Sequence, residues 1–126
     1  LNVEDFETGR LVQHICDLSN DLVFEKYIDI FNDAELIFLD GPKDGKFEYE
    51  LLKNILQSQI LGKQKERILI IDDIKFLNMV KLWRYIESPK IDISSLAHWS
   101  GTGVVDLSKT LKINNKAFLN NISQYY

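Results

Sequence analysis

The stretch ELIFLDGPKDGKFEYELLKNILQSQILGKQKERILIIDDI, residues 35–74, decides the fold expected for this chain. It contains two short apolar runs, 36–39 and 68–71, separated by an amphipathic segment of helical length. Unbroken apolar runs are typical of parallel strands that are buried on both faces. We therefore predict a right-handed βαβ unit, in which the strands lie parallel and the helix crosses between them.

Acidic residues follow both predicted strands directly. Asp40 ends the first strand, and Asp72 and Asp73 end the second. Ligands in open α/β sheets bind outside the carboxyl ends of the strands. We expect these carboxylates, and Lys43 in the loop after the first strand, at the ligand-binding edge of the sheet.

Strands and helices alternate on both sides of this unit, as hydrophobic periodicity and turn residues indicate. The predicted helices span 21–31, 47–61 and 76–87, and the other predicted strands span 11–16, 91–99 and 104–107. The last two strands flank a glycine-containing turn, which is typical of an antiparallel hairpin. The fold expected is α/β: a Rossmann-like, mostly parallel sheet with helices on both faces and a terminal antiparallel β-hairpin. We assign residues 1–108 to this domain and residues 109–126 to a C-terminal tail with a weak helix near 115–122.

Composition narrows the classes of function. The 126 residues carry a net charge of −4 and a pI of about 5.1, whereas nucleic-acid-binding surfaces usually show a basic excess. No apolar run approaches the roughly 20 residues that span a bilayer. The single cysteine, Cys16, has no partner for an internal disulfide, which is the usual state in a reducing compartment. We therefore expect a cytoplasmic protein that binds neither nucleic acid nor a membrane.

The order of the elements and three phrases resemble the second half of class I S-adenosylmethionine-dependent methyltransferases, in particular small-molecule O-methyltransferases. The phrases are LIFLDGPKDG at 36–45, IIDDI at 70–74 and HWSGTG at 98–103. In that family the final strand is inserted antiparallel to the others. The resemblance covers most of residues 35–107. It implies S-adenosylmethionine as cofactor and a hydroxyl of a small molecule, such as a sugar, as methyl acceptor.

Metal-dependent members of the family place an Asp at the end of the fourth strand, a Lys three residues later and an acidic pair at the end of the fifth strand. The matching residues here are Asp40, Lys43, Asp72 and Asp73. By resemblance, the three carboxylates bind Mg²⁺ or another divalent cation, which prefers oxygen ligands. Lys43 would take the proton from a hydroxyl whose pKa the cation lowers.

The resemblance also implies cofactor residues. Glu4 or Asp5 is the candidate for the acid that binds the ribose hydroxyls, and Asp17, with Leu18 beside it, would lie near the adenine. Asp40 would adjoin the same site. The glycine-rich loop that receives the methionine end of the cofactor does not occur in this sequence, so the resemblance implies an incomplete methyltransferase fold that does not bind cofactor alone.

His98 and Trp99 are the candidates for residues that face the substrate. The glycines that follow them, Gly101 and Gly103, are no substitute for the cofactor loop, because they lie in a hairpin.

The alternative is a non-catalytic α/β scaffold or interaction module. Acids at strand ends are often solvated or cap the next helix, and a fold alone does not establish a function. The same acidic strand end occurs in Walker B motifs, but the GxxxxGK[ST] phosphate loop is missing from the sequence. An unpaired sheet edge would also favour a homodimer.

Overall fold

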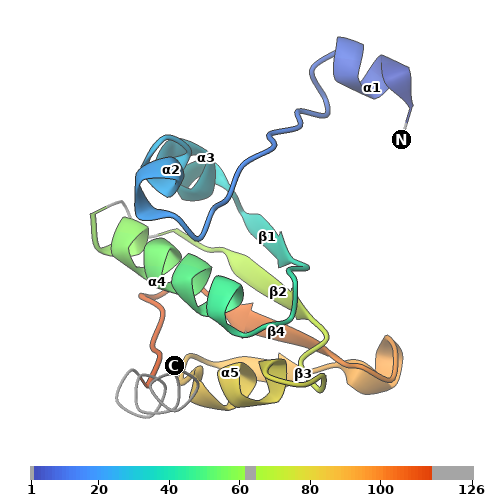
Figure 1. Ribbon diagram of the computed structural model, residues 1–126, viewed down its shortest axis with the longest axis vertical. Helices are drawn as coiled ribbons and strands as arrows, with labels where there is room; N and C mark the ends of the chain where they lie inside the picture. Colours follow the sequence, from blue (N-terminus) through green and yellow to red (C-terminus); the bar gives the residue numbers. More distant parts are fainter. Residues whose placement is uncertain (1, 62–64, 115–126) are drawn as a thin grey trace.

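The computed structural model describes residues 2–61 and 65–114, with a four-stranded sheet in the order β1-β2-β4-β3 at its centre. The strands are β1 (Leu36–Leu39), β2 (Ile68–Asp72), β3 (Lys90–Asp92) and β4 (Thr102–Asp106). The helices are α1 (Val3–Glu7), α2 (Asp21–Glu25), α3 (Ile28–Asp33), α4 (Lys46–Leu61) and α5 (Met79–Tyr85), and Ser94–Leu96 forms a 3₁₀ turn (Figure 1).

The βαβ arrangement of β1, α4 and β2 is confirmed. The strands pair in parallel, with Leu36 opposite Ile68 and Leu39 opposite Ile71, and α4 connects them. Asp44 fixes the start of the helix, since its Oδ1 accepts hydrogen bonds from the backbone N–H groups of the first turn at 2.8 and 2.9 Å. Local sequence signals thus determine this unit.

The terminal hairpin is confirmed in direction but not in length. Strand β4 runs antiparallel to both β2 and β3, so the last strand lies inside the sheet. The strand predicted over 91–99 ends at Asp92, because its carboxylate accepts hydrogen bonds from the N–H and hydroxyl of Ser94. Such a side-chain turn competes with the strand ladder and starts the long loop that precedes β4.

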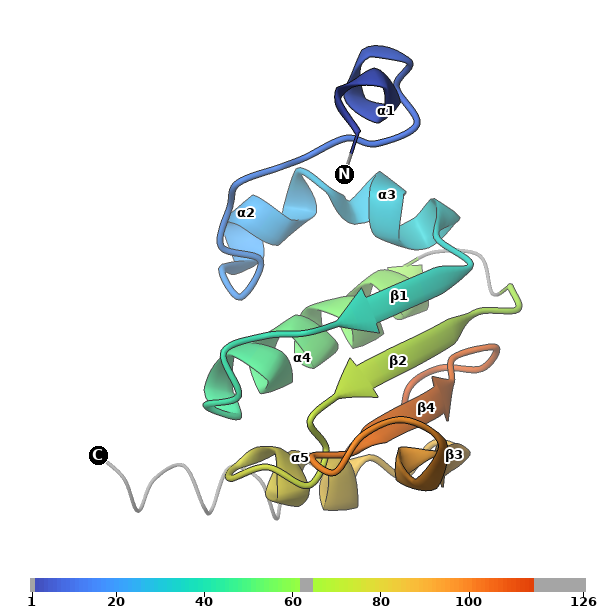
Figure 2. The same cartoon turned by 90° about the vertical axis from the view of Figure 1, so that its right-hand side faces the viewer.

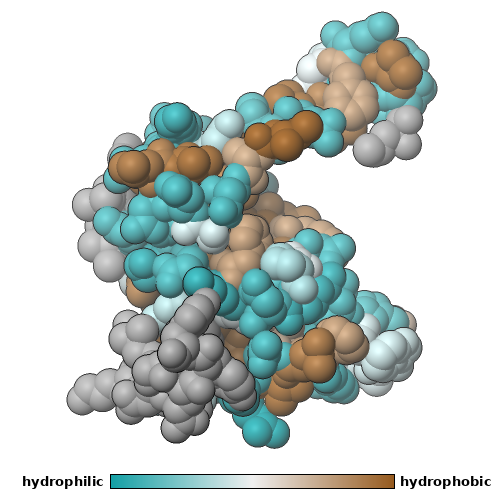
Figure 3. Space-filling model, in the orientation of Figure 1, coloured by the Kyte–Doolittle hydropathy of each residue, from teal (hydrophilic) through white to brown (hydrophobic). Residues whose placement is uncertain are grey.

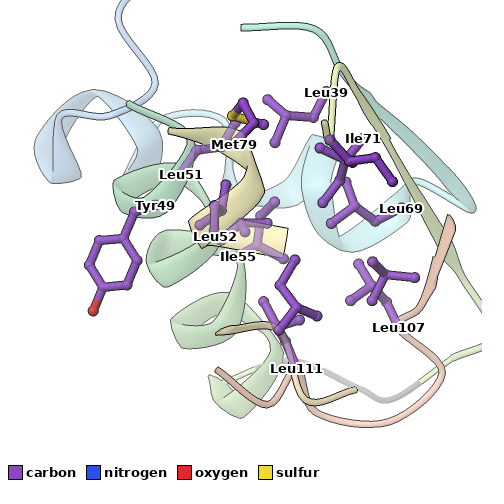
Figure 4. Close-up of a cluster of buried hydrophobic side chains, with 14 of the residues drawn as sticks. Leu39, Tyr49, Leu51, Leu52, Ile55, Leu69, Ile71, Met79, Leu107 and Leu111 are labelled. Atoms are coloured by element: carbon purple, nitrogen blue, oxygen red, sulfur yellow. The ribbon is translucent and has the colours of Figure 1, made fainter. Parts of the chain in front are cut away.

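Helices α4 and α5 pack on one face of the sheet. Leu51, Leu52 and Ile55 of α4 lie opposite Leu39, Leu69 and Ile71 of the strands (Figure 4). Helix α5 lies on the same face, because Trp83 contacts β4 so closely that a Cβ at Gly103 would come within 2.5 Å of its ring. In the described ranges, the expectation of helices on both faces is therefore wrong. Figure 2 looks onto the other face, with α4 behind the strands.

The strand predicted over 11–16 does not form. This segment has no strand partner, and its apolar side chains face solvent, with Val12 65% and Ile15 93% exposed. Figure 3 shows the resulting apolar surface on the segment that leads from α1 to α2. A strand needs a neighbour for its backbone groups, and local sequence does not supply one.

The helix predicted over 21–31 is divided into α2 and α3. Asn20 caps α2, accepting hydrogen bonds from the N–H groups of Leu22 and Val23 at 3.0 and 3.3 Å. The division falls at Tyr27, whose ψ of 7° leaves the helical range.

The compact body continues past residue 108, where the sequence placed its end. Leu111 belongs to the core at 2% exposure, and its N–H donates to Gln59 Oε1 at 2.9 Å. Ile113 forms a β-bridge with Ile86. The weak helix predicted near 115–122 lies outside the described residues. Within them, no helix has the length and apolar character needed to cross a membrane.

Candidate functional site

Lys43 joins the acids that follow the two parallel strands. Its ammonium contacts Asp40, at the end of β1, and lies 3.2 Å from Oδ2 of Asp73, which follows β2. The carboxyl ends of parallel neighbours meet at one edge of a sheet, so these side chains converge where the sequence predicted.

A second group of polar side chains lies beside them. His98 Nε2 lies 2.7 Å from Asp72 Oδ1, and His98 Nδ1 lies 2.6 Å from Ser100 Oγ. His98 and Ser100 stand in the loop before β4, and the antiparallel pairing of Asp72 with Thr102 brings this loop to the end of β2. Sequence reasoning missed Ser100, because its second partner, Asp73, lies far from it in the chain.

These contacts restrict the protons of the group. A carboxylate only accepts hydrogen bonds, so His98 Nε2 donates to Asp72. In the neutral ring, Nδ1 is then the acceptor of the Ser100 hydroxyl proton. Ser100 also hydrogen-bonds to Asp73, so the ring and this second carboxylate are alternative acceptors for its single hydroxyl proton. Ser100 thereby connects the two halves of the site.

The charges of the site reinforce one another. The hydrogen bond from Ser100, and then the contacts with Lys43, lower the pKa of Asp73 against the desolvation that raises it. The hydrogen bond to Asp40 is the largest cause that raises the pKa of Lys43, and Asp73 adds to it. Lys43 is therefore held as an ammonium at neutral pH.

Glu48 is the second residue that sequence reasoning missed. Its buried carboxylate accepts hydrogen bonds from the N–H of Lys43 at 2.7 Å and of Gly45 at 2.9 Å. It holds Lys43 in the left-handed region, at φ 63°, and leaves no room for a Cβ at Gly41, which would come within 2.5 Å of its Oε1. A local sequence signal for this role was present. Glu48 is the third residue of α4, and its side chain accepts from the N–H of Gly45, the residue just before the helix, as in a capping box.

The site offers ligands for a divalent cation, although the set differs from the one expected. Asp72, Asp73 and His98 each present a ligand atom, and these atoms lie within 4.8 Å of one another. Asp40 is not in this group, and its carboxylate contacts Lys43 instead. Two carboxylates and an imidazole suit Mn²⁺ or Zn²⁺ as well as Mg²⁺.

Of the residues expected to bind the cofactor, Asp40 lies at this edge, whereas the acids from the first part of the chain do not join it. Glu4 and Asp5 lie in α1, well apart from the sheet in Figure 1, where Asp5 contacts Arg10 at 3.8 Å. Asp17 accepts hydrogen bonds from the N–H and hydroxyl of Ser19 at 3.0 and 2.6 Å. In the described ranges these residues therefore form no common cofactor pocket.

Two other candidates take different positions. Leu18 packs against the core, and its carbonyl accepts a hydrogen bond from Asn54 at 3.3 Å. Trp99 is 84% exposed and makes an edge-on contact with Phe76, at 6.4 Å between ring centres. Trp99 thus lies in the His98 loop without a polar role in the site.

Comparisons with protein-family models, curated proteins and solved structures give no match to this chain.

Acid is expected to weaken the fold through Asp73. The pKa of Asp73 is lowered in the folded state. The contribution of Asp73 to the free energy of unfolding is therefore complete at a pH above the ordinary Asp pKa of about 4, and it is lost as the pH falls through the lower pKa of the folded state. Ser100→Ala removes the largest cause of the shift and should make the acid-side decline in the free energy of unfolding shallower. Urea unfolding measured across the acid range tests this. Ser95→Ala, at an exposed position, is the control, and an unchanged decline in Ser100→Ala would contradict the prediction.

Proposed function

We propose that this chain forms the acceptor-binding part of an S-adenosylmethionine-dependent methyltransferase that acts on a hydroxyl of a small molecule, such as a sugar. One observation carries the proposal: Lys43 bridges Asp40 and Asp73 at the carboxyl ends of neighbouring parallel strands. The antiparallel insertion of β4 between β2 and β3 supports it further, since the resemblance implies such a last strand.

The residues at this edge have two roles in the proposed reaction, namely binding a cation and removing the proton of the acceptor hydroxyl. Asp72, Asp73 and His98 would hold a divalent cation, which lowers the pKa of a hydroxyl bound to it. Lys43 would then take the hydroxyl proton, which requires the free amine. Its ion pairs oppose this, so the contact of Asp73 with Lys43 must loosen before the proton moves. Withdrawal of Asp73 removes one of the causes that raise the pKa of Lys43.

A non-catalytic scaffold or interaction module is the second candidate function. The separation of Glu4 and Asp5 from the sheet edge favours it, because the residues expected to bind the ribose lie apart from the acids of that edge. The two candidates differ in a simple property, namely whether the chain binds S-adenosylmethionine.

Calorimetric titration of S-adenosylmethionine and S-adenosylhomocysteine into the chain decides between them. If this chain is catalytic despite the missing glycine-rich loop, binding should fall in the micromolar range and be strengthened by Mg²⁺ or Mn²⁺. In Asp72→Ala the metal effect should disappear, since a ligand atom and the hydrogen bond that orients His98 are both lost. Asp29→Ala, an exposed acid in α3, is the matched control. No heat of binding at millimolar ligand would reject the methyltransferase proposal for this chain and favour the scaffold.

A further inference from the structure

The sheet face opposite α4 and α5 carries a continuous row of apolar side chains. Phe38, Ile70, Val104 and Ile91 are successive partners across the four strands. Phe38 and Ile91 are each 60% exposed, and Ile70 and Val104 are half-buried. Figure 2 looks onto this face: α4 lies behind β1 and β2, no described helix lies in front of these two strands, and the loop with the 3₁₀ turn Ser94–Leu96 lies in front at the β3 end.

Leu36 and Ile68 widen the row at the start of β1 and β2, at 58% and 46% exposure. Parallel strands normally have both faces covered. Large contiguous apolar patches on a protein surface usually mark an interaction site. The face, which we call the open face and define by these six residues, therefore has the character of a surface that another element covers.

The open face is hollowed and acidic at one end. A cavity of about 700 Å³ is lined there by Ile68, Ile91 and Val104 together with Glu35, Glu66 and Asp106. Hydrogen bonds from Ser108, and then Lys109, lower the pKa of Asp106, so this carboxyl is ionised at neutral pH.

The two cations among the lining residues place their charged ends elsewhere. The Arg67 guanidinium donates to the carbonyl groups of Phe31 and Asn32, at 3.2 Å each. The Lys90 ammonium donates to carbonyl groups of α5 and the residue after it, and lies 4.8 Å from the centre of the Trp83 ring. The rim of the cavity is therefore left with an excess of negative charge toward solvent.

The size of the open face favours a helix over a second copy of this chain. Four strands about 4.8 Å apart, each three to five residues long, give a projected face of roughly 19 by 13 Å, or about 250 Å². A stable dimer usually buries about 800 Å² on each partner. A helix is about 10 Å wide and needs about 13 residues to cross 19 Å, so one helix covers the face. A second copy would also bring a second set of rim acids, whereas basic side chains would complement them.

We propose that the open face binds an amphipathic α-helix of a partner protein, whose apolar stripe packs on the strand row and whose flank carries Lys or Arg opposite Glu35, Glu66 and Asp106. The packing follows the helix-in-groove mode of peptide recognition. The proposal is independent of methyl transfer, since the open face and the His98 site lie on different parts of the sheet.

The test uses a labelled synthetic helix of about 18 residues, with Leu at core-facing helical positions and Lys on the flanks. Fluorescence anisotropy should show saturable, salt-sensitive binding to the chain. Phe38→Ser and Ile91→Ser together should weaken it by about tenfold or more, because they remove the ends of the strand row. Both side chains are largely exposed, so these changes should leave the fold intact, as circular dichroism can verify. Leu96→Ser, at an 86% exposed position in the 3₁₀ turn, is the control and should bind as the parent chain does.

A second peptide, with Glu in place of Lys, should bind about tenfold more weakly. Equal binding of both peptides would overturn the proposal. Equal binding of the Lys peptide by the double variant Phe38→Ser, Ile91→Ser and by the control Leu96→Ser would overturn it as well. So would the absence of binding at millimolar peptide. Sedimentation gives the last outcome: a dimer that Phe38→Ser dissociates would show that a second copy covers the open face instead.

Discussion

Replacing Glu48 with leucine is expected to lower the free energy of unfolding by about 2–4 kcal/mol, since a buried donor left without its acceptor costs about 1–3 kcal/mol. Two donors lose their acceptor at once, the N–H groups of Lys43 and Gly45. Leucine has a similar volume but no hydrogen-bonding group, so the loop after β1 loses the side-chain acceptor that α4 supplies to it. Urea unfolding at neutral pH measures the loss, and faster amide exchange at Lys43 and Gly45 would localise it.

Glu50→Leu is the matched control for Glu48→Leu. Glu50 lies one half-turn later on the same helix and contacts Lys53 at 2.7 Å in a partly exposed ion pair, which is worth at most about 1 kcal/mol. Glu48→Gln should fall between the two, because the amide keeps one acceptor and turns an N–H₂ group toward the other donor. If Glu48→Leu unfolds no more easily than Glu50→Leu, the buried carboxylate does not hold the loop.

The parts of the fold that sequence predicted well are those with local signals. The strand pair β1 and β2 follows from two unbroken apolar runs, and α4 follows from a long amphipathic pattern. The position of Asp40 and Asp73 at one edge then needs only the rule that ligand sites lie at the carboxyl ends of parallel strands. Their contact through Lys43 is the detail that this rule leaves open.

The parts that sequence did not predict depend on contacts between distant segments. The apolar run at 11–16 has the composition of a strand but no neighbour to pair with. Ser100 reaches Asp73, and His98 reaches Asp72, only because β4 inserts next to β2. The uncovered face likewise follows from the placement of α5 beside α4, which helical periodicity does not specify. Glu48 differs, since its spacing from Gly45 was a local signal.

Lys43→Met is expected to lower methyl transfer by about 10²–10⁴-fold under the proposed function, which is the usual contribution of a general base. The assay measures S-adenosylhomocysteine formed from S-adenosylmethionine with Mg²⁺ and a panel of hydroxylated acceptors, namely simple sugars and catechol. Lys26→Met, at an exposed position at the end of α2, controls for the loss of a positive charge elsewhere. Normal turnover in Lys43→Met would exclude Lys43 from the reaction.

Lys43→Arg tests whether Lys43 acts as a base or only as a fixed positive charge. Arginine can keep the contacts with Asp40 and Asp73, yet it stays protonated at any working pH. If Lys43 removes the acceptor proton, the Arg variant should be as slow as the Met variant. The raised pKa of Lys43 adds a second signature, because the parent rate should still increase above neutral pH as the free amine forms. Asp40→Asn removes the largest cause of the raised pKa and should move this increase to lower pH. Recovery of the parent rate in Lys43→Arg would instead show that Lys43 acts only through its charge.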